Sequence, residues 1–124
     1  MNQLNFEHTS ADNVEVLEVI GEIDIASASR LMNGLNETVG DCDKPVVVDL
    51  TAVEFMDSTG LALLLNAHRR LARRDQGFAI VCGDGPVSRV FEITDMVGTL
   101  NVHADRDAAV SAAAGETDSG LARG

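Results

Sequence analysis

The segment Phe55–Leu61, F-M-D-S-T-G-L, lies between a β-branched run that begins at Val46 and a leucine-rich stretch that begins at Leu61. The run V-V-V-D-L is typical of a central strand that is covered on both faces. The leucine-rich stretch has helical spacing and predicts a helix from about Thr59 to Arg74. We therefore expect a strand to pass into a helix here through two hydroxyl residues, flanked by an acid and a glycine.

Predicted strands and helices alternate along the rest of the chain. Period-two alternation predicts a strand near residues 4–8 and a second over 14–23, which together form a hairpin. Further strands are expected at 78–82 and 100–103, and further helices over 28–39, 86–98 and 106–114. A hairpin followed by such alternation predicts a single α/β domain, with a mixed sheet of four to five strands flanked by about four helices.

The charge of the chain makes some classes of partner unfavourable. The 124 residues carry a formal net charge of −11, and residues 1–57 hold 12 acids against only 2 bases. This excess of acid disfavours binding to nucleic acid or to an anionic membrane. Cys42 and Cys82 form no C-x-x-C pair and complete no zinc set with a histidine, so we expect reduced thiols, no metal and no other cofactor.

The two ends of the chain give predictions about location and domain limits. The first residues, M-N-Q-L-N-F-E-H, lack the pattern of a signal peptide, and no apolar run reaches the length of a membrane span. These features predict a cytoplasmic protein. Residues 1–114 are expected to form the domain, whereas residues 115–124 are polar and glycine-rich and predict a flexible tail.

Capping alone could explain the polar residues at the strand-to-helix junction. If the helix begins at Ser58 or Thr59, either hydroxyl can cap its first amide groups. Asp57 also suits the positive end of the helix dipole. Spacing by itself does not separate Ser58 from Thr59 as the more important hydroxyl.

Of three catalytic interpretations of the junction, the nucleophile elbow is weak, and the phosphate-binding loop and the receiver domain are excluded. A G-x-S-x-G nucleophile elbow needs glycine where Met56 stands. A phosphate-binding loop needs G-K-[ST], but the only lysine is Lys44, before the strand. A phosphorylated receiver domain needs a lysine near its final strand, and the chain has none there. The hydroxyl is therefore presented without machinery of its own, as a substrate would be.

Four motifs occur in an order that resembles the STAS domain of bacterial anti-sigma factor antagonists. They are G-E-I-D at 21–24, V-V-V-D-L at 46–50, F-M-D-S-T-G-L at 55–61 and F-E-I-T at 91–94, and the match covers roughly residues 4–113. In that family the partner anti-sigma factor, a serine kinase, phosphorylates the serine after the aspartate. The resemblance implies that Ser58 is this serine, that Thr59 is the cap, and that Asp24 lies close to Ser58.

The resemblance implies a binding module rather than an enzyme. The unphosphorylated chain would bind an anti-sigma factor serine/threonine kinase, which holds the ATP, and thereby release a sigma factor. Phosphorylation of Ser58 would abolish this binding, and a phosphoserine phosphatase would restore it. The expected partner-binding residues are Asp24, Asp57, Ser58, Thr59 and Gly60. Two alternatives remain open: a STAS scaffold or regulatory subunit of a sensory or transport complex, and a small serine-dependent enzyme.

Other polar residues of the predicted helix have structural explanations. His68 falls on its apolar face, so we expect a core histidine with satisfied hydrogen bonds. Gly60 either permits close approach of a partner backbone or relieves crowding at the helix start. Four arginines near the helix C-terminus suit the dipole and predict a solvated face: Arg69, Arg70, Arg73 and Arg74.

Overall fold

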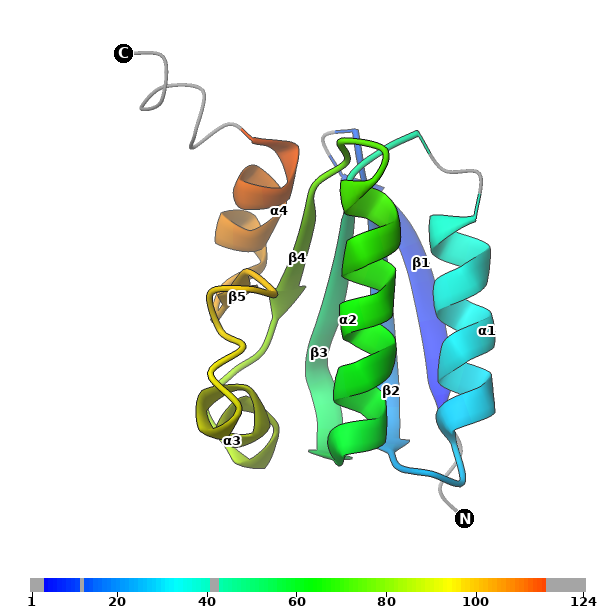
Figure 1. Cartoon of the computed structure of the whole chain (residues 1–124), viewed down its shortest axis with the longest axis vertical. Helices are drawn as coiled ribbons and strands as arrows, with labels where there is room; N and C mark the ends of the chain where they lie inside the picture. Colours follow the sequence, from blue (N-terminus) through cyan, green and yellow to red (C-terminus); the bar gives the residue numbers. More distant parts are fainter. Residues whose placement is uncertain (1–3, 12, 41–42, 116–124) are drawn as a thin grey trace.

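The computed structural model describes residues 4–11, 13–40 and 43–115, which form one sheet with helices packed on it (Figure 1). The strands are β1 (Asn5–Ala11), β2 (Val14–Ile23), β3 (Val46–Met56), β4 (Phe78–Val81) and β5 (Val102–His103). The helices are α1 (Ala28–Val39), α2 (Ser58–Ala72), α3 (Pro86–Ile93) and α4 (Arg106–Ala114). The strands lie in the order β1-β2-β3-β4-β5, with β1 antiparallel to β2 and the others parallel. The predicted mixed α/β sheet and its initial hairpin are confirmed.

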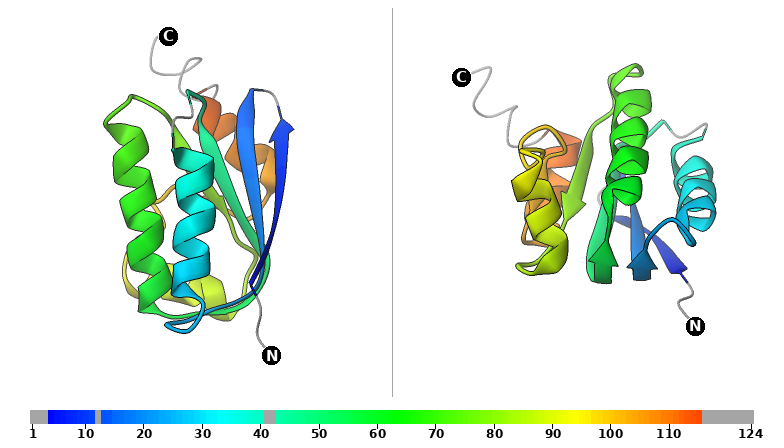
Figure 2. Two further views of the ribbon diagram at one scale, coloured as in Figure 1. Left: turned by 90° about the vertical axis from the view of Figure 1, so that its right-hand side faces the viewer. Right: turned by 60° about the horizontal axis from the view of Figure 1, so that its bottom comes forward.

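The helices are divided between the two faces of the sheet (Figure 2). Each parallel crossover steps to the next strand in the same direction, so right-handed connections place α1, α2 and α3 on one face. The larger core cluster lies on this side and includes Leu31, Leu64 and Phe91. Helix α4 covers part of the opposite face, where Val47 and Val110 belong to a smaller cluster. Strand β3 is therefore covered on both sides, as its valines predict.

Strand β3 is longer than its β-branched run suggested. It continues to Met56 because β2 pairs with it as far as Ile23↔Met56. Phe55 and Met56 are thus strand residues, and α2 begins two residues after the strand ends, at Ser58. The carboxyl ends of β2 and β3 and the first turn of α2 lie at one edge of the molecule (Figure 1).

Some element boundaries differ from the sequence-based expectation. Helix α3 ends at Ile93 rather than near Gly98, because the chain leaves helical geometry at Asp95, whose φ is 60°. In the ranges that the structure describes, no helix is long and apolar enough to cross a membrane. Cys42 and the expected tail beyond Gly115 lie outside the described residues.

Candidate functional site

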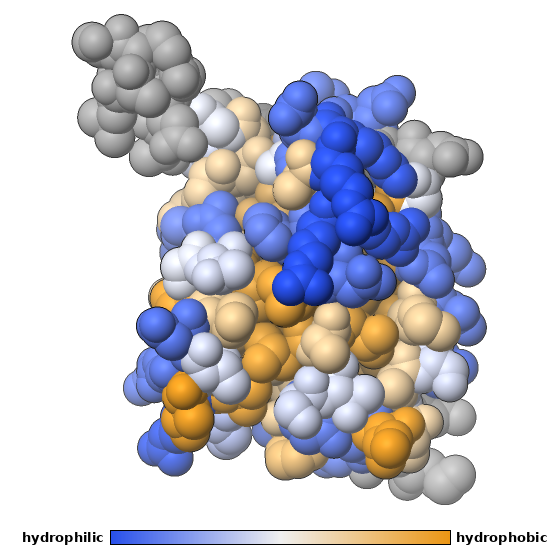
Figure 3. Space-filling model, in the orientation of Figure 1, coloured by the Kyte–Doolittle hydropathy of each residue, from blue (hydrophilic) through white to orange (hydrophobic). Residues whose placement is uncertain are grey.

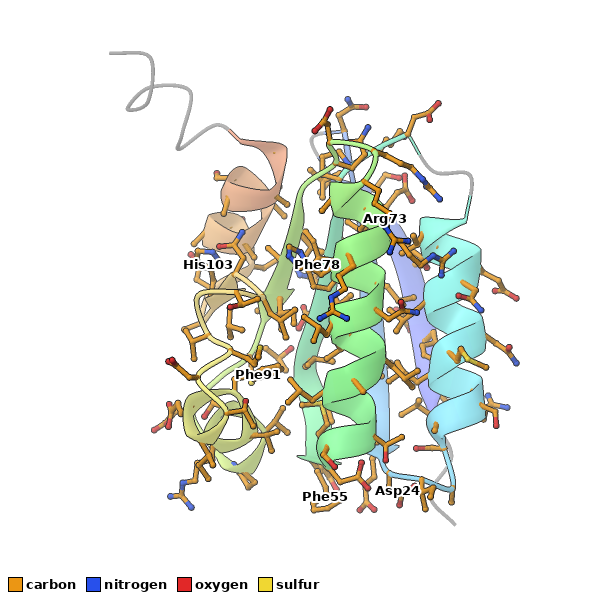
Figure 4. The ribbon with its side chains drawn as sticks, in the orientation of Figure 1. Asp24, Phe55, Arg73, Phe78, Phe91 and His103 are labelled. Carbon is orange, nitrogen blue, oxygen red and sulfur yellow. The ribbon has the colours of Figure 1, made fainter. Side chains whose placement is uncertain are left out.

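The ends of β2 and β3 are joined next to the start of α2. The Asp57 N–H donates to the Ile23 carbonyl at 3.1 Å, and Glu22 pairs with Phe55 in the parallel register. This pairing brings Asp24, which follows β2, to the same edge as Asp57 and Ser58. Figure 4 shows Asp24 and Phe55 at this end of the molecule, below the first turn of α2.

Asp57 is the N-cap of α2. Its Oδ1 accepts the Thr59 N–H at 2.9 Å, and its backbone is extended, with φ −104° and ψ −174°. We expected a side-chain hydroxyl to cap the helix and the resemblance implied Thr59 as this cap. This expectation is wrong. The reason is that the backbone of Asp57 still pairs with β2, and a residue held extended just before a helix is the N-cap.

Ser58 is the first residue of α2 and is exposed. Its side chain makes no hydrogen bond within the part of the chain that the structure describes. Asp57 already serves as the cap, so the Ser58 hydroxyl has no structural task in the helix start. The positive end of the α2 dipole lies at this residue and favours a negative group attached to it.

Asp24 is fixed in a tight turn by reciprocal hydrogen bonds with Ser27. The Asp24 N–H donates to Ser27 Oγ at 3.0 Å, and the Ser27 N–H donates to Asp24 Oδ1 at 3.0 Å. The Ser27 hydroxyl also donates to the Glu22 carbonyl at 2.8 Å. Sequence reasoning missed this role of Ser27, although an acid followed three residues later by a hydroxyl is a pattern of reciprocal capping.

Gly60 lets α2 lie close to the strand ends. A methyl group on Gly60 would stand 2.5 Å from Cγ2 of Ile23 and 2.7 Å from Cγ of Met56, too close for real atoms. Gly60 is buried, so of its two expected roles the geometry supports the relief of crowding. Through this packing the glycine sets the height of Ser58 above the sheet edge.

Two apolar side chains at this edge were not singled out from the sequence. Ile25 lies in the turn after Asp24 and is 80% exposed, and Phe55 lies in β3 and is 46% exposed. Phe55 was quoted within its motif but was given no role. An isoleucine two residues after the end of a strand, next to an aspartate, is the signal that could have drawn attention to Ile25.

A second polar cluster fastens α4 to β3 on the other face. Asp49 is buried; its Oδ1 accepts the Thr51 N–H and hydroxyl, and its Oδ2 accepts Arg106 Nε at 2.9 Å. Burial alone would raise the pKa of Asp49, but the hydrogen bonds from Thr51 and the Arg106 guanidinium outweigh it and lower this pKa below its ordinary value. The Asp49–Arg106 pair therefore holds α4 against β3, and it is not part of the site around Ser58.

The C-terminal part of α2 and the residues just after it differ from expectation in two respects. His68 is only partly buried, its ring lies 5.8 Å from that of Phe78, and its Nδ1 is buried without a hydrogen-bond partner among the described residues. The expectation of a satisfied histidine is therefore wrong. The arginines are also not simply solvated, because Arg70 donates to Asn36 Oδ1 and Arg74 to the Val39 carbonyl, which ties α2 to α1.

Neither a thiol nor a metal site lies in the described ranges near Ser58. Burial raises the pKa of the Cys82 thiol to about 11, and the charges of Glu92 and Asp49 add to this, so it is not a nucleophile at neutral pH. No group of three or more histidine, cysteine or acidic residues that could hold a metal ion occurs among residues 4–11, 13–40 and 43–115.

Comparison with known proteins defines the family. The model of the STAS domain matches residues 5–109, so the chain belongs to the STAS domain family. An anti-sigma-B factor antagonist of Staphylococcus aureus is 31% identical over 100 residues, which cover 81% of this chain and 93% of that protein. The anti-sigma-F factor antagonist RsfB of Mycobacterium tuberculosis is 39% identical over 67 residues, 52% of this chain and 55% of RsfB.

Solved structures confirm the fold. An anti-sigma factor antagonist from Mycobacterium paratuberculosis has a TM-score of 0.82 at 29% identity, covering 90% of this chain and 94% of that one. SpoIIAA in its unphosphorylated form has a TM-score of 0.68 at 19% identity, covering 86% and 94%, and supports the fold alone. The predicted resemblance to the STAS domain and the predicted fold class are both confirmed.

Proposed function

We propose that this chain is an anti-sigma factor antagonist that works by partner switching in the cytoplasm. Unphosphorylated, it binds an anti-sigma factor serine/threonine kinase and so frees a sigma factor; phosphorylated on Ser58, it no longer binds. The observation that carries the proposal is the Ser58 hydroxyl, exposed and without a hydrogen bond in the described chain, at the first turn of a helix already capped by Asp57. Its relatives named as anti-sigma factor antagonists support the choice of partner.

Phosphorylation at this position is compatible with the fold. A phosphoserine adds a charge of about −1.5 to −2 at neutral pH. At the first residue of α2 the helix dipole offsets part of its cost by up to about 1 kcal/mol. The Ser58 side chain is exposed, so no core contact is lost. The modification therefore acts on binding rather than on folding.

Among the described residues no histidine contacts Ser58 as a base, which supports the serine as a substrate of another enzyme. Each histidine is engaged elsewhere: His8 Nε2 lies 3.0 Å from Glu15, His103 Nε2 lies 2.8 Å from Asn101 Oδ1, and His68 packs under α2 against Phe78. A nucleophilic serine needs an adjacent base within hydrogen-bond reach. The kinase therefore brings both the ATP and the catalytic groups, and a phosphoserine phosphatase resets the switch.

The test is phosphosite mapping with candidate anti-sigma factor kinases of the same organism. The chain is incubated with each kinase and ATP, and the modified peptide is identified by mass spectrometry. We expect one phosphate on Ser58, none on a Ser58→Ala variant, and unchanged modification of a Thr59→Ala control. A phosphate that persists on Ser58→Ala, or that disappears from Thr59→Ala, would show that the assignment to Ser58 is wrong.

A further inference from the structure

Strand β1 lies at a free edge of the sheet. It pairs with β2 on one side, and no strand in the described ranges pairs with its other side. Its seven residues, N-F-E-H-T-S-A, pair with β2 without a bulge and include neither proline nor lysine. Proline, lysine and bulges are common means by which an edge strand avoids pairing with another chain. The unpaired backbone groups of β1 are therefore open to a further strand, whereas β5, at the opposite edge, has only two residues.

The side of α1 that points away from α2 lies beside this edge (Figures 1 and 2). The other side of α1 contacts α2, where Asn36 accepts a hydrogen bond from Arg70. Four residues at helical spacing line a hollow of about 210 Å³ together with Phe6 of β1: Arg30, Asn33, Gly34 and Glu37. The Phe6 ring lies against Gly34, because an added methyl group there would stand 2.9 Å from Cζ of Phe6. We call β1 and these four residues of α1 the β1 edge.

The β1 edge carries opposite charges at its two ends. Arg30 and Glu37 are seven residues apart, about 10 Å along the helix. Arg30 Nε donates to the Leu4 carbonyl at 3.0 Å, which fixes the position of the guanidinium. Glu37 is exposed, and its side chain has no partner among the described residues. In a second copy turned by a twofold axis, α1 runs antiparallel, so that Arg30 of each copy faces Glu37 of the other.

The same twofold axis gives a favourable register to the strands. The midpoint between the two charges of α1 lies next to Gly34, which is level with Phe6. An antiparallel pair of β1 strands centred there places Phe6 opposite Phe6 of the second copy, and Asn5 opposite Glu7. Cross-strand aromatic pairs stabilise a sheet, whereas like charges directly opposite each other destabilise it, as they would if the axis passed through Glu7. The helix and the strand therefore favour one and the same arrangement.

We propose that the chain forms a homodimer through the β1 edge, with the two β1 strands antiparallel in one continuous sheet and the two α1 helices side by side over it. The partner is a second copy, because this arrangement pairs the free backbone groups of both strands and the charges of both helices. Helix α1 lies between the β1 edge and α2, so Ser58 stays exposed in the dimer (Figures 1 and 2). The inference goes beyond the proposed function and does not depend on it.

The test measures the mass of the full chain against its concentration and exchanges the charges of the β1 edge. Sedimentation velocity follows the mass over about a hundredfold range of concentration, up to about 500 µM. The variants are Arg30→Glu, Glu37→Arg and the double variant that carries both changes. Arg69→Glu is the control, because Arg69 is exposed on α2 and its side chain has no partner among the described residues. Thermal melts establish that each variant folds, and amide hydrogen exchange of β1 is followed in parallel.

We expect the mass to rise from that of one chain to that of two, and the exchange of the β1 amides to slow as the dimer forms. Each single charge reversal should raise the Kd of the dimer about tenfold, because the twofold axis turns two opposite-charge pairs into two like-charge pairs. The double variant should return the Kd to within about threefold of that of the wild-type chain, and Arg69→Glu should leave it unchanged. A monomer at every concentration would overturn the inference. A dimer that leaves β1 exchange unchanged, single reversals with no more effect than Arg69→Glu, or a double variant that dimerises no better than the single ones would also overturn it.

Discussion

Asp57 and Ser58 are neighbours with different tasks: Asp57 caps the helix, and Ser58 is the proposed site of phosphorylation. Asp57 closes the helix: its carboxylate accepts the Thr59 N–H at 2.9 Å. Ser58 is left exposed and without a hydrogen bond in the described chain. A switch residue that also capped α2 would alter the stability of the helix each time it was modified. The separation of tasks lets the surface charge change while the fold stays the same.

This division predicts different stabilities for two neighbouring alanine variants. Asp57→Ala should lower the free energy of unfolding by about 1 kcal/mol, because the Thr59 N–H loses its partner. The free energy of unfolding of Ser58→Ala should lie within about 0.5 kcal/mol of that of the wild-type chain, because the substitution removes an exposed hydroxyl that makes no hydrogen bond in the described chain. Urea unfolding at pH 7 measures both. The reverse order of the two effects would show that Ser58 is the cap.

At the scale of elements, the height of α2 above the sheet depends on one glycine. Gly60→Ala should destabilise the protein by about 1 to 3 kcal/mol, because its methyl group would clash with Ile23 and Met56. The matched control is Gly98→Ala, where an added methyl group meets nothing within 4 Å. Thermal melts compare the two variants. Equal melting temperatures for Gly60→Ala and the unmodified chain would mean that α2 does not lie as close to the strand ends as described.

The link between α4 and β3 predicts a pH-dependent stability. Burial raises the pKa of Asp49, but its Thr51 and Arg106 partners lower it overall, so its ionised form stabilises the fold above the unfolded pKa, near 3.8. This contribution is lost as the pH falls through the folded pKa. Arg106→Ala should cost about 2 kcal/mol at pH 7, with allowance for the partial exposure of Arg106. The deficit should shrink as the pH falls below the unfolded pKa and the carboxyl group of Asp49 begins to take up a proton.

Urea unfolding at pH 7, 5 and 3 follows this deficit, with Arg89→Ala as the control. Arg89 is exposed on α3 and its side chain has no partner among the described residues, so its removal should change the free energy of unfolding by less than about 0.5 kcal/mol at each pH. A deficit for Arg106→Ala that is independent of pH would contradict an ionic role for Asp49.

The elements around Ser58 could be predicted because their signals are local. The valines before Leu50 and the leucines after Gly60 have the periods of a buried strand and a helix. The cap could not be predicted, because it depends on the long-range bond from the Asp57 N–H to the Ile23 carbonyl, which keeps Asp57 extended. The end of α3 at Ile93 could not be predicted for another reason. The helix is followed by Asp95, which has a positive φ, and a positive φ is expected from the sequence mainly at glycine.

Exposure was the feature of the site that the sequence could not supply. Ile25 and Phe55 look like core residues in a linear pattern, and only the folded structure shows that both side chains are exposed. The sequence also could not predict that His68 Nδ1 lacks a hydrogen-bond partner among the described residues. Helical spacing predicts the face of α2 on which His68 lies, but not which groups surround its ring. The partner-binding roles of Asp24, Ser58 and Thr59 came from the family resemblance and remain proposals, whereas the capping role expected of Thr59 is wrong.

At the scale of the whole molecule, charge is distributed unevenly. Residues 1–57 hold 12 of the 20 acids, and four of the nine basic residues gather in the C-terminal part of α2 and just beyond it. Figure 3 shows the strongly hydrophilic atoms over the upper part of α2 and hydrophobic atoms over the lower part of the same face. The Ser58 edge is thus separated from the arginines by the length of the helix. A partner with a basic surface would be steered to the acidic part of the molecule.

The measurement that tests the central claim most directly is the affinity of the kinase for the chain before and after stoichiometric phosphorylation of Ser58. Calorimetry gives both values of Kd, and melting temperatures of the two forms report on the fold. We predict that phosphorylation weakens binding at least about a hundredfold, several kcal/mol of electrostatic and desolvation cost, while the melting temperature moves by no more than about 2 °C. Equal affinity of the two forms, or unfolding of the phosphorylated chain, would contradict the account.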